Sequence, residues 1–421
     1  MNTNVTNVSD YETGYECGKK WDSFRSNYAQ VHGWASLLVC IFGCIANSLN
    51  IAVLTRRDMR SPTNMILTGL AVADLLVMIE YIPYAIHLYL YRRPRRDTFT
   101  YGWAVFVLFH SNFAQVCHTI SICLTLTLAI WRYIAVAHPQ KNHEWCSQRR
   151  TIIAIVGAYL FCPILCIPLY ITTEVRSQIE LLDENGMNVN MTNVQNNNYW
   201  NYSIYNNTSN TTLYFVKLKE TPMVNGMLKE MNFWIYSVVI KLIPCMVLTI
   251  LSIKLVIVLL EAKERRKKLT TTALKTNDER LADKATNDQT KMKKKKANRN
   301  MEKERQTDRT TMMLLAVLLL FLLTELPQGV LGLLSVILGS SFFHTCYVML
   351  GDVIDILTLI NSAINFILYC TMSRQFRTTF KQLFCSKWRN LSRWMPIPQQ
   401  PMDNNGNTGA TNHTVTQVTQ V

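Results

Sequence analysis

Seven separate apolar stretches limit the fold of this chain more than any other feature of its sequence. Each contains the roughly 20 mostly apolar residues that a helix needs to cross a bilayer. Lipid offers no hydrogen-bond partners, so each stretch must satisfy its own backbone as an α-helix. The sequence therefore predicts an all-α fold, a seven-transmembrane helix bundle. The stretches cover approximately residues 33–55, 64–90, 103–136, 150–172, 232–260, 310–338 and 346–370.

The distribution of positive charge predicts how the bundle is oriented. Lysine and arginine concentrate after the first, third, fifth and seventh stretches, most strongly in segment 261–309. Since such basic loops stay in the cytoplasm, we expect a multi-pass plasma-membrane protein with an extracellular N-terminus. One outer loop, with Arg92, Arg93, Arg95 and Arg96, is a basic exception. The net charge of +15 flanks the spans, where it meets anionic membrane lipid, so no nucleic-acid partner is expected.

The loops and chain ends are expected to differ in character. The segment after the seventh stretch places Phe376, Phe380 and Phe384 at helical spacing with basic residues between them, which is typical of a short amphipathic helix on the inner leaflet. Cys385 at its end is either palmitoylated or a free thiol. The predicted regions are an extracellular N-terminus (1–32), the bundle (33–370) with a long glycosylated extracellular loop (173–231) and a basic cytoplasmic loop (261–309), the membrane-surface helix (371–385) and a disordered cytoplasmic tail (386–421).

The same topology sorts the cysteines and the glycosylation motifs. It places Cys17 and Cys346 outside and the other cysteines in helices or in the reducing cytoplasm. We therefore expect a disulfide between Cys17 and Cys346. Asn390 and Asn412 match the Asn-x-Ser/Thr motif on the inner side, where it has no meaning. The outer glycosylation candidates are Asn4, Asn7, Asn190, Asn201, Asn206, Asn207 and Asn210.

Polar residues inside the apolar stretches are costly and mark functional positions. Here they form an ordered set that comprises Asn47, Leu70–Asp74, Ile130–Tyr133, Pro244, Glu325–Pro327, Asn361 and Asn365–Tyr369. Across residues 33–385 this set resembles the rhodopsin-like (class A) G-protein-coupled receptors. The resemblance implies a receptor that passes a signal to a heterotrimeric G protein, and later to arrestin.

A narrower resemblance concerns two motifs. Trp131-Arg132-Tyr133 and the segment 324–329 (Thr-Glu-Leu-Pro-Gln-Gly) are similar to those of invertebrate myosuppressin and FMRFamide-type neuropeptide receptors, with sex-peptide receptors as relatives. This resemblance implies a short peptide ligand that ends in an amidated Arg-Phe, and a G protein of the Gi/o type. No enzymatic activity is expected, because no nucleophile–base pair, metal-spaced cluster or phosphate loop is present in the sequence.

Several positions depart from the rhodopsin-like pattern. Trp131 replaces the usual acid before the motif arginine, Glu325 replaces a tryptophan, and Phe366 replaces a proline. Val107 stands where a bridging cysteine is usual, and the loop 173–231 contains no cysteine to pair with it. We expect the fold to be kept and the details of activation to differ.

The resemblance assigns Arg132, Tyr133 and Tyr369 to G-protein coupling. Arg132 lacks its neighbouring acid, and Asp308 at the base of the sixth stretch is a candidate partner. The alternative is that Arg132 is an anchor whose head reaches the membrane surface.

A second implied site lies around Asp74 in the second stretch. The resemblance places Ser121, Asn361 and Asn365 around it, and these oxygen ligands suit a small hard cation such as sodium. The alternative is a hydrogen-bonded network without an ion. No other metal and no cofactor is expected.

Acids near the outer surface are candidates for ligand binding. A guanidinium binds best to a carboxylate that it meets with two hydrogen bonds away from bulk water. Glu80 and Asp355 lie deep enough in their helices for this role, whereas Asp352 is expected to be a solvated helix start. We expect Tyr84, Phe113 and Gln115 to flank the aromatic and amide groups of the ligand.

Glu325 lies two residues before Pro327, which should kink the sixth helix and provide a hinge. Its carboxyl either responds to the ligand or simply accepts a hydrogen bond from His118 across the bundle. Both alternatives remain open at this point.

Other classes of protein are disfavoured. An amine receptor would need an acid at Ala114, an opsin would need a lysine at Leu359, and a transporter would show repeated halves. A receptor for an unrelated peptide or small ligand remains an alternative. The terminal Thr419-Gln420-Val421 is of the kind that PDZ domains bind as an added strand.

Overall fold

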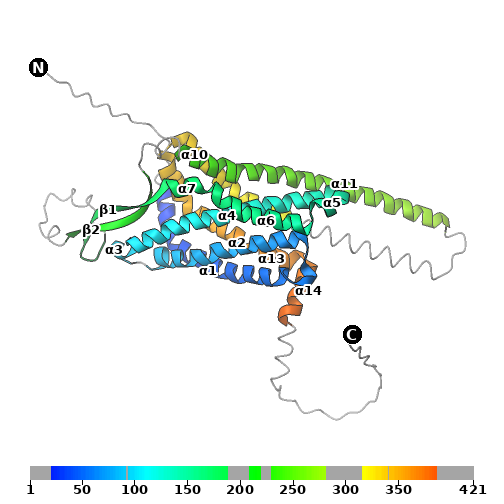
Figure 1. Cartoon of the computed structure of the whole chain (residues 1–421), viewed down its shortest axis with the longest axis horizontal. Helices are drawn as coiled ribbons and strands as arrows, with labels where there is room; N and C mark the ends of the chain where they lie inside the picture. Colours follow the sequence, from blue (N-terminus) through cyan, green and yellow to red (C-terminus); the bar gives the residue numbers. More distant parts are fainter. Residues whose placement is uncertain are drawn as a thin grey trace, which may run out of the picture. The chain divides into compact units, whose positions relative to one another are not determined.

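A computed structural model of the chain describes residues 20–91, 93–187, 208–219, 229–280, 315–339 and 341–385. Within them lie seven helices that are long and apolar enough to cross a membrane, which confirms the predicted bundle (Figure 1). The seven spans are Asn27–Leu54, Pro62–Leu90, Tyr101–Ala137, Gln148–Thr172, Ile235–Val258, Leu315–Gly339 and Gly351–Thr371.

Three of the helices that carry these spans, α1, α4 and α11, are longer than the predicted apolar stretches. α1 begins at Lys20, within the predicted N-terminal segment, and α11 continues to Arg280, far into the basic loop. The long helices are α1 (Lys20–Leu54), α2 (Pro62–Ala85), α4 (Tyr101–Ala137), α6 (Gln148–Leu165), α11 (Ile243–Arg280), the sixth span (Leu315–Gly339) and α13 (Gly351–Met372). Shorter ones are η1 (Arg57–Met59), η2 (Ile86–Leu90), α3 (Arg95–Thr98), α5 (Pro139–Trp145), α7 (Ile167–Thr172), α10 (Lys229–Trp234), η4 (Ile235–Leu242), η5 (Phe343–Tyr347), η6 (Val348–Leu350), α14 (Arg374–Phe380) and η7 (Lys381–Cys385).

Local sequence explains where the helices begin. The hydroxyl of Ser61 accepts a hydrogen bond from the backbone N–H of Asn64 at 3.2 Å, and Pro62 follows at the first helical position. This arrangement satisfies one of the free N–H groups at a helix start. Ser147 caps α6 in the same way.

The bundle packs around α2 and α4. α2 contacts both α1 and α4, α13 lies against α1, and α11 lies against α4. Met78 on α2 is fully buried in a core cluster with Cys40 and Leu359. By contrast, Leu38, Leu160 and Leu323 are each about two-thirds exposed, at 66%, 66% and 63%. Apolar side chains directed outward are what a bundle surrounded by lipid requires.

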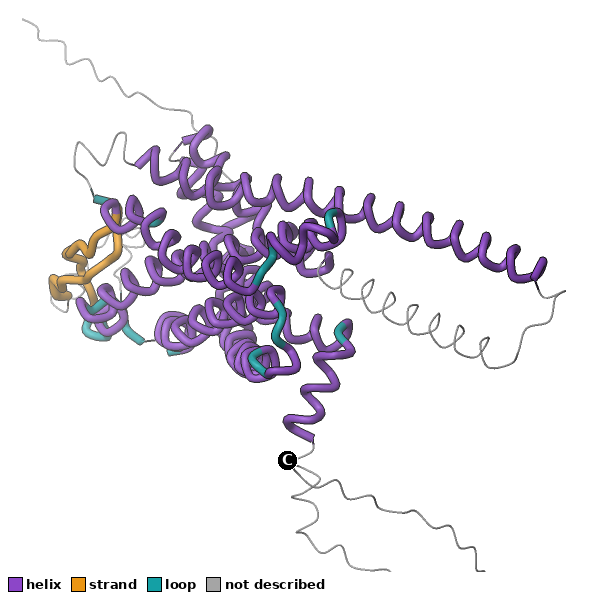
Figure 2. Tube along the Cα trace, turned by 45° about the vertical axis from the view of Figure 1, so that its right-hand side comes forward, coloured by secondary structure: helices purple, strands orange, loops and turns teal. Residues whose placement is uncertain are grey.

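A β-hairpin lies at one end of the bundle, and the all-α prediction did not include it (Figure 2). β1 (Thr173–Asp183) pairs antiparallel with β2 (Thr208–Leu218), in a register that joins Thr173 to Leu218 and Asp183 to Thr208. Both strands belong to the loop that was predicted to be extracellular.

The hairpin is attached to the start of the third span without a disulfide to α4. Arg95 on α3 donates two hydrogen bonds to Glu180 on β1, both at 3.0 Å, and its guanidinium lies over the rings of Phe99 and Phe215. The backbone N–H of Tyr214 donates to the carbonyl of Phe99 at 3.0 Å. These contacts give the basic loop before the third span a structural role.

The chain divides into two compact units, with the boundary after Thr379. The first, Met1–Thr379, contains the bundle and the hairpin. The second, Phe380–Val421, contains the last residue of α14 and η7, and the ring of Phe380 lies 4.9 Å from that of Phe384 in η7.

Candidate functional site

A buried acid on α2 has a direct partner on α4. The Oε2 atom of Glu80 lies 2.5 Å from Nδ1 of His110, and the His110 ring stacks on Tyr84 with centroids 4.0 Å apart. Glu80 is 8% exposed, and its second oxygen, Oε1, is buried without a hydrogen-bond partner in the described part of the chain. One acceptor oxygen of this carboxyl is therefore available for a further donor.

Two more acids reach the same region from α13. Tyr89 donates from its hydroxyl to Oδ1 of Asp352 at 2.7 Å, so this half-buried side chain is not the solvated helix start that was expected. Asp355 is half-buried, makes no hydrogen bond to another described residue, and is close enough to Glu80 and His110 to interact with them electrostatically. We call Glu80, Tyr84, Tyr89, His110, Asp352 and Asp355 the acid–tyrosine cluster.

The acid–tyrosine cluster is held from α1 as well. His32 is fully buried, and its Nε2 lies 3.1 Å from the hydroxyl of Tyr81. The His32 ring also meets Tyr89 edge-on at 4.7 Å. Aromatic rings from the first two spans therefore hold the ends of these spans around the acids.

Deeper in the bundle, Glu325 forms a buried triad with His118 and Lys241. His118 on α4 places Nε2 2.9 Å from Oε2 of Glu325, which confirms the contact that was one of two alternatives. Lys241 on η4 donates to the same oxygen. Glu325 is fully buried and Lys241 is 1% exposed. The three side chains link the third, fifth and sixth spans through one carboxylate oxygen.

Lys241 was missed in the sequence analysis. A lysine within an apolar stretch was the signal that could have found it, because charged groups at that depth require a partner. Beside the triad, Gln328 donates from its amide to the hydroxyl of Tyr236, which extends the polar contacts between the fifth and sixth spans.

The residues around Asp74 are partly brought together. Ser121 donates to Oδ1 of Asp74 at 3.0 Å, and the Asn365 amide donates to Oδ2 at 3.2 Å. Asn361 makes no hydrogen bond to Asp74 in the residues that the structure describes, whereas Ser362, which was not predicted, lies against the carboxyl. Asp74 is 2% exposed. These polar groups are compatible with a bound cation and with a hydrogen-bonded network that holds no ion.

Trp131 connects the C-terminal end of the third span to the fourth. Its indole N–H donates to the hydroxyl of Thr151 at 3.0 Å, and Thr151 is fully buried. The thiol of Cys146 donates to the Trp131 carbonyl at 3.9 Å. Burial raises the pKa of Cys146, which keeps this thiol protonated. The residue that replaces the usual acid is therefore a bridge between helices.

The other predicted coupling residues lie at the same end. Arg132 is half-buried, and its Nε is without a partner among the described residues, to which Asp308 does not belong. The Tyr133 ring meets His138 edge-on at 6.2 Å. Tyr369 is 2% exposed and packs on Phe376 of α14 with ring centroids 5.7 Å apart. G-protein contact by these residues stays a prediction.

Two predicted ligand contacts, Phe113 and Gln115, lie on α4. In the sequence they fall between His110 of the acid–tyrosine cluster and His118 of the triad. Phe113 stacks on Phe109 at 5.1 Å and packs against the core around Met78. Gln115 donates to Thr119 at 3.3 Å. These contacts are within the bundle, so ligand contact by Phe113 and Gln115 stays a prediction.

The predicted modifications are only partly within the described residues. Cys346 is disulfide-bonded and 2% exposed, but Cys17 lies outside the described residues, so their pairing stays a prediction. Asn210 is exposed on β2. The side chain of Cys385 is not described. The remaining glycosylation candidates, Asn4, Asn7, Asn190, Asn201, Asn206 and Asn207, also lie outside the described residues.

Comparison with known proteins places these sites in a family. The family model described as serpentine type 7TM GPCR chemoreceptor Srw matches residues 34–287 and 286–387. G-protein coupled receptor dmsr-1 of Caenorhabditis elegans is 30% identical over 394 residues, which cover 89% of this chain and 72% of that protein. The sex peptide receptor of Drosophila melanogaster is 26% identical over 364 residues, 85% of this chain and 73% of that receptor.

The FMRFamide receptor of Drosophila melanogaster is similar over a shorter region. It is 30% identical over 136 residues, which cover 30% of this chain and 23% of that receptor. The family match spans the seven helices, the buried polar positions and the C-terminal end of the third span. The chain therefore belongs to the serpentine seven-transmembrane G-protein-coupled receptor family Srw, and it resembles neuropeptide receptors.

Proposed function

We propose that this receptor binds a short peptide with an amidated Arg-Phe end at the acid–tyrosine cluster and signals through a heterotrimeric G protein of the Gi/o type. The observation that carries the proposal is the convergence of Glu80, Asp352 and Asp355 from two helices. Their oxygens are buried or half-buried and are not all hydrogen-bonded. A ligand guanidinium has five donors in a fixed planar arrangement and suits such acceptors.

The surroundings of the acids favour a cation over a neutral ligand. Tyr84 and Tyr89 border the acids and present aromatic rings, which attract a cation through their faces. The names of two relatives, the sex peptide receptor and the FMRFamide receptor, support a peptide ligand. A receptor for an unrelated peptide or small ligand is the second candidate.

A screen of matched peptides separates the two candidates. Cells that express the chain are titrated with peptides ending in Arg-Phe-amide and with the same peptides ending in the free acid, while sensors record dissociation of Gi/o and Gq proteins. We expect the amides to activate Gi/o and the free acids to be much weaker. The carboxylate of a free acid would be repelled by the negative charges of Glu80, Asp352 and Asp355. Equal responses to both forms, or none to either, would reject the proposed ligand class.

We further propose that the hairpin end of the bundle is extracellular, in the plasma membrane, and that Cys346 pairs with Cys17. The exposed sequon at Asn210 and the basic composition of α11 after its span support this orientation. Cys346 precedes α13 on the hairpin side, where oxidation is allowed. Mass mapping of a non-reducing digest would find the Cys17–Cys346 peptide pair if the proposal holds. In this orientation the C-terminal Thr419-Gln420-Val421 lies in the cytoplasm, where a PDZ domain can bind it. Arrestin would bind the receptor from the same side.

A further inference from the structure

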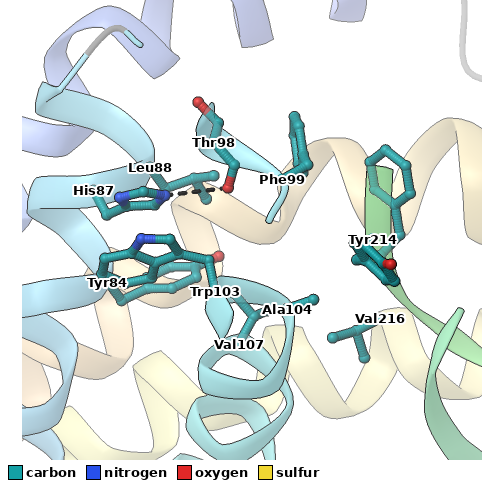
Figure 3. Close-up of a pocket in the computed structure, with 11 residues that line it drawn as sticks. Tyr84, His87, Leu88, Thr98, Phe99, Trp103, Ala104, Val107, Tyr214 and Val216 are labelled. Atoms are coloured by element: carbon teal, nitrogen blue, oxygen red, sulfur yellow. Dashed lines mark hydrogen bonds between the residues drawn. The ribbon is translucent and has the colours of Figure 1, made fainter. Parts of the chain in front are cut away.

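A cavity of about 220 Å³ lies between the hairpin and the outer ends of the second and third spans (Figure 3). Tyr84 and His87 border it from α2 and η2, Trp103 and Val107 border it from α4, and Tyr214 borders it from β2. Figure 3 shows the His87 and Trp103 rings on one side and the strand with Tyr214 and Val216 on the other.

The walls of the cavity are mostly aromatic rings. His87 stacks on Trp103 with centroids 3.5 Å apart and an interplanar angle of 15°. Phe99 and Phe215, which also line the cavity, have ring centroids 4.8 Å apart. The polar atom of His87 that could face a ligand is occupied, because its Nε2 lies 3.1 Å from the carbonyl of Thr98. The cavity therefore selects for an apolar or aromatic group.

The size of the cavity suits one ring. An apolar cavity of about 150 Å³ is enough to bind benzene. A cavity of about 220 Å³ therefore has room for a benzyl group, and the surrounding rings allow edge-to-face contacts with it. Val107, at the position where related receptors usually have a bridging cysteine, contributes part of the apolar wall.

The cavity and the acid–tyrosine cluster share a wall. Tyr84 borders the cavity, and the same ring stacks on His110, the partner of Glu80. A ligand with a basic side chain and an aromatic side chain next to each other can therefore contact both sites at once.

We propose that this cavity binds one aromatic side chain of the ligand while the acid–tyrosine cluster binds the neighbouring cation. This inference rests on the proposed function and adds to it the site that reads the aromatic residue. The hairpin forms one wall, so its attachment through Arg95 and Glu180 also positions the cavity.

The first test fills the cavity. Val107→Phe places a ring in it, while Val105→Phe is the matched control, because Val105 is on the same helix but 42% exposed on the outer surface. Potency is measured for an Arg-Phe-amide peptide and for the same peptide with alanine in place of phenylalanine. In the unmodified receptor the alanine peptide should be weaker by about tenfold to a hundredfold, the effect of burying one ring.

Val107→Phe should remove this preference by weakening the phenylalanine peptide alone, and Val105→Phe should keep it. An unchanged preference in Val107→Phe would overturn the proposal. Retained response to the alanine peptide and equal surface expression show that the variant is folded.

A second measurement locates the ring directly. A peptide with a benzophenone-bearing residue in place of phenylalanine is photo-cross-linked to the unmodified receptor and mapped by mass spectrometry. Cross-links within residues 98–107 or 214–216 support the proposal, and cross-links confined to the fifth or sixth span overturn it.

If no Arg-Phe-amide peptide binds, the proposed function fails while the cavity can still be tested. N-acetylphenylalaninamide is then added to purified receptor and its contact is followed by saturation-transfer NMR. Ring signals that are present for the unmodified receptor and Val105→Phe but lost for Val107→Phe support an aromatic site. Equal signals for all three proteins, or no signal for any, would contradict it.

Discussion

His118 on the third span and Glu325 on the sixth lie 2.9 Å apart between Nε2 and Oε2, and Lys241 on the fifth span contacts the same carboxylate oxygen. All three residues are at most 8% exposed. A buried charge is costly unless it is paired and hydrogen-bonded. The relative positions of three helices are therefore coupled to a single carboxyl group, two residues before the proline that should kink the sixth span.

Removing the lysine should expose this coupling. Lys241→Met leaves Glu325 facing only His118, and breaking a buried pair in this way costs about 3–5 kcal/mol. We expect a large fall in the thermal stability of the purified, ligand-free receptor.

The control is the double variant Lys241→Met with Glu325→Gln, which removes both charges but keeps a side chain that can hydrogen-bond His118. It should recover much of the lost stability, because no unpaired charge remains. A single variant as stable as the unmodified protein would show that the triad is not an ion pair.

The attachment of the hairpin gives a second prediction. Arg95→Gln removes the two hydrogen bonds to Glu180 and the contacts over Phe99 and Phe215. Arg95 is 33% exposed, so the loss of overall stability should be at most about 1 kcal/mol. Backbone amides of β2 should nevertheless exchange with deuterium faster, because the strand is held at fewer points.

Arg96→Gln is the matched control, since it removes only an exposed contact to Asp97 at 3.7 Å. Its exchange pattern in β2 should match that of the unmodified receptor. Equal exchange in both variants would mean that Arg95 does not hold the hairpin.

A double-mutant cycle tests the bridge from the third to the fourth span. Trp131→Phe and Thr151→Val each remove the hydrogen bond between the indole and the hydroxyl, and each should cost about 1 kcal/mol of stability. The double variant should cost less than the sum, because the bond is lost only once. Strict additivity in thermal unfolding would argue against a direct bridge.

The buried carboxylate of Asp74 and the hydroxyl of Ser121 beside it predict a sodium effect. Agonist affinity is measured in sodium chloride and in choline chloride at equal ionic strength, and we expect it to differ. Asp74→Asn should abolish the difference, because the charge that binds the cation is gone. An affinity that is identical in the two salts for the unmodified receptor would favour the ion-free network.

Much of the bundle could be predicted because a long apolar run in lipid has one stable solution, the helix. The same argument located Asp74, Glu80 and Glu325, since a charged group at that depth needs a partner. The resemblance to rhodopsin-like receptors placed Ser121 and Asn365 at Asp74, where the structure has them. The contact from His118 was one of two alternatives for Glu325, and the structure contains it.

The partners that were missed depend on packing rather than on local pattern. Lys241 lies in a stretch that is still apolar overall, and nothing in its sequence neighbourhood identifies Glu325 as its partner. Likewise, β1 and β2 pair across a long connection without a short turn motif, so neither the hairpin nor the Arg95–Glu180 contact was predicted. The contact between His110 and Glu80 depends on how the second and third spans pack side by side, so the sequence alone did not predict it.

The most direct test of the central claim combines acid variants with a neutral peptide. Glu80→Gln and Asp355→Asn are compared with Glu184→Gln, an exposed acid in the hairpin region. Each receptor is titrated with an Arg-Phe-amide peptide and with the same peptide carrying uncharged citrulline in place of arginine.

Loss of a charged hydrogen bond should weaken the arginine peptide by about tenfold to a hundredfold in Glu80→Gln and Asp355→Asn. The citrulline peptide should be much less affected, and Glu184→Gln should respond to both peptides like the unmodified receptor. Undiminished potency of the arginine peptide on both acid variants, at equal surface expression, would contradict the account.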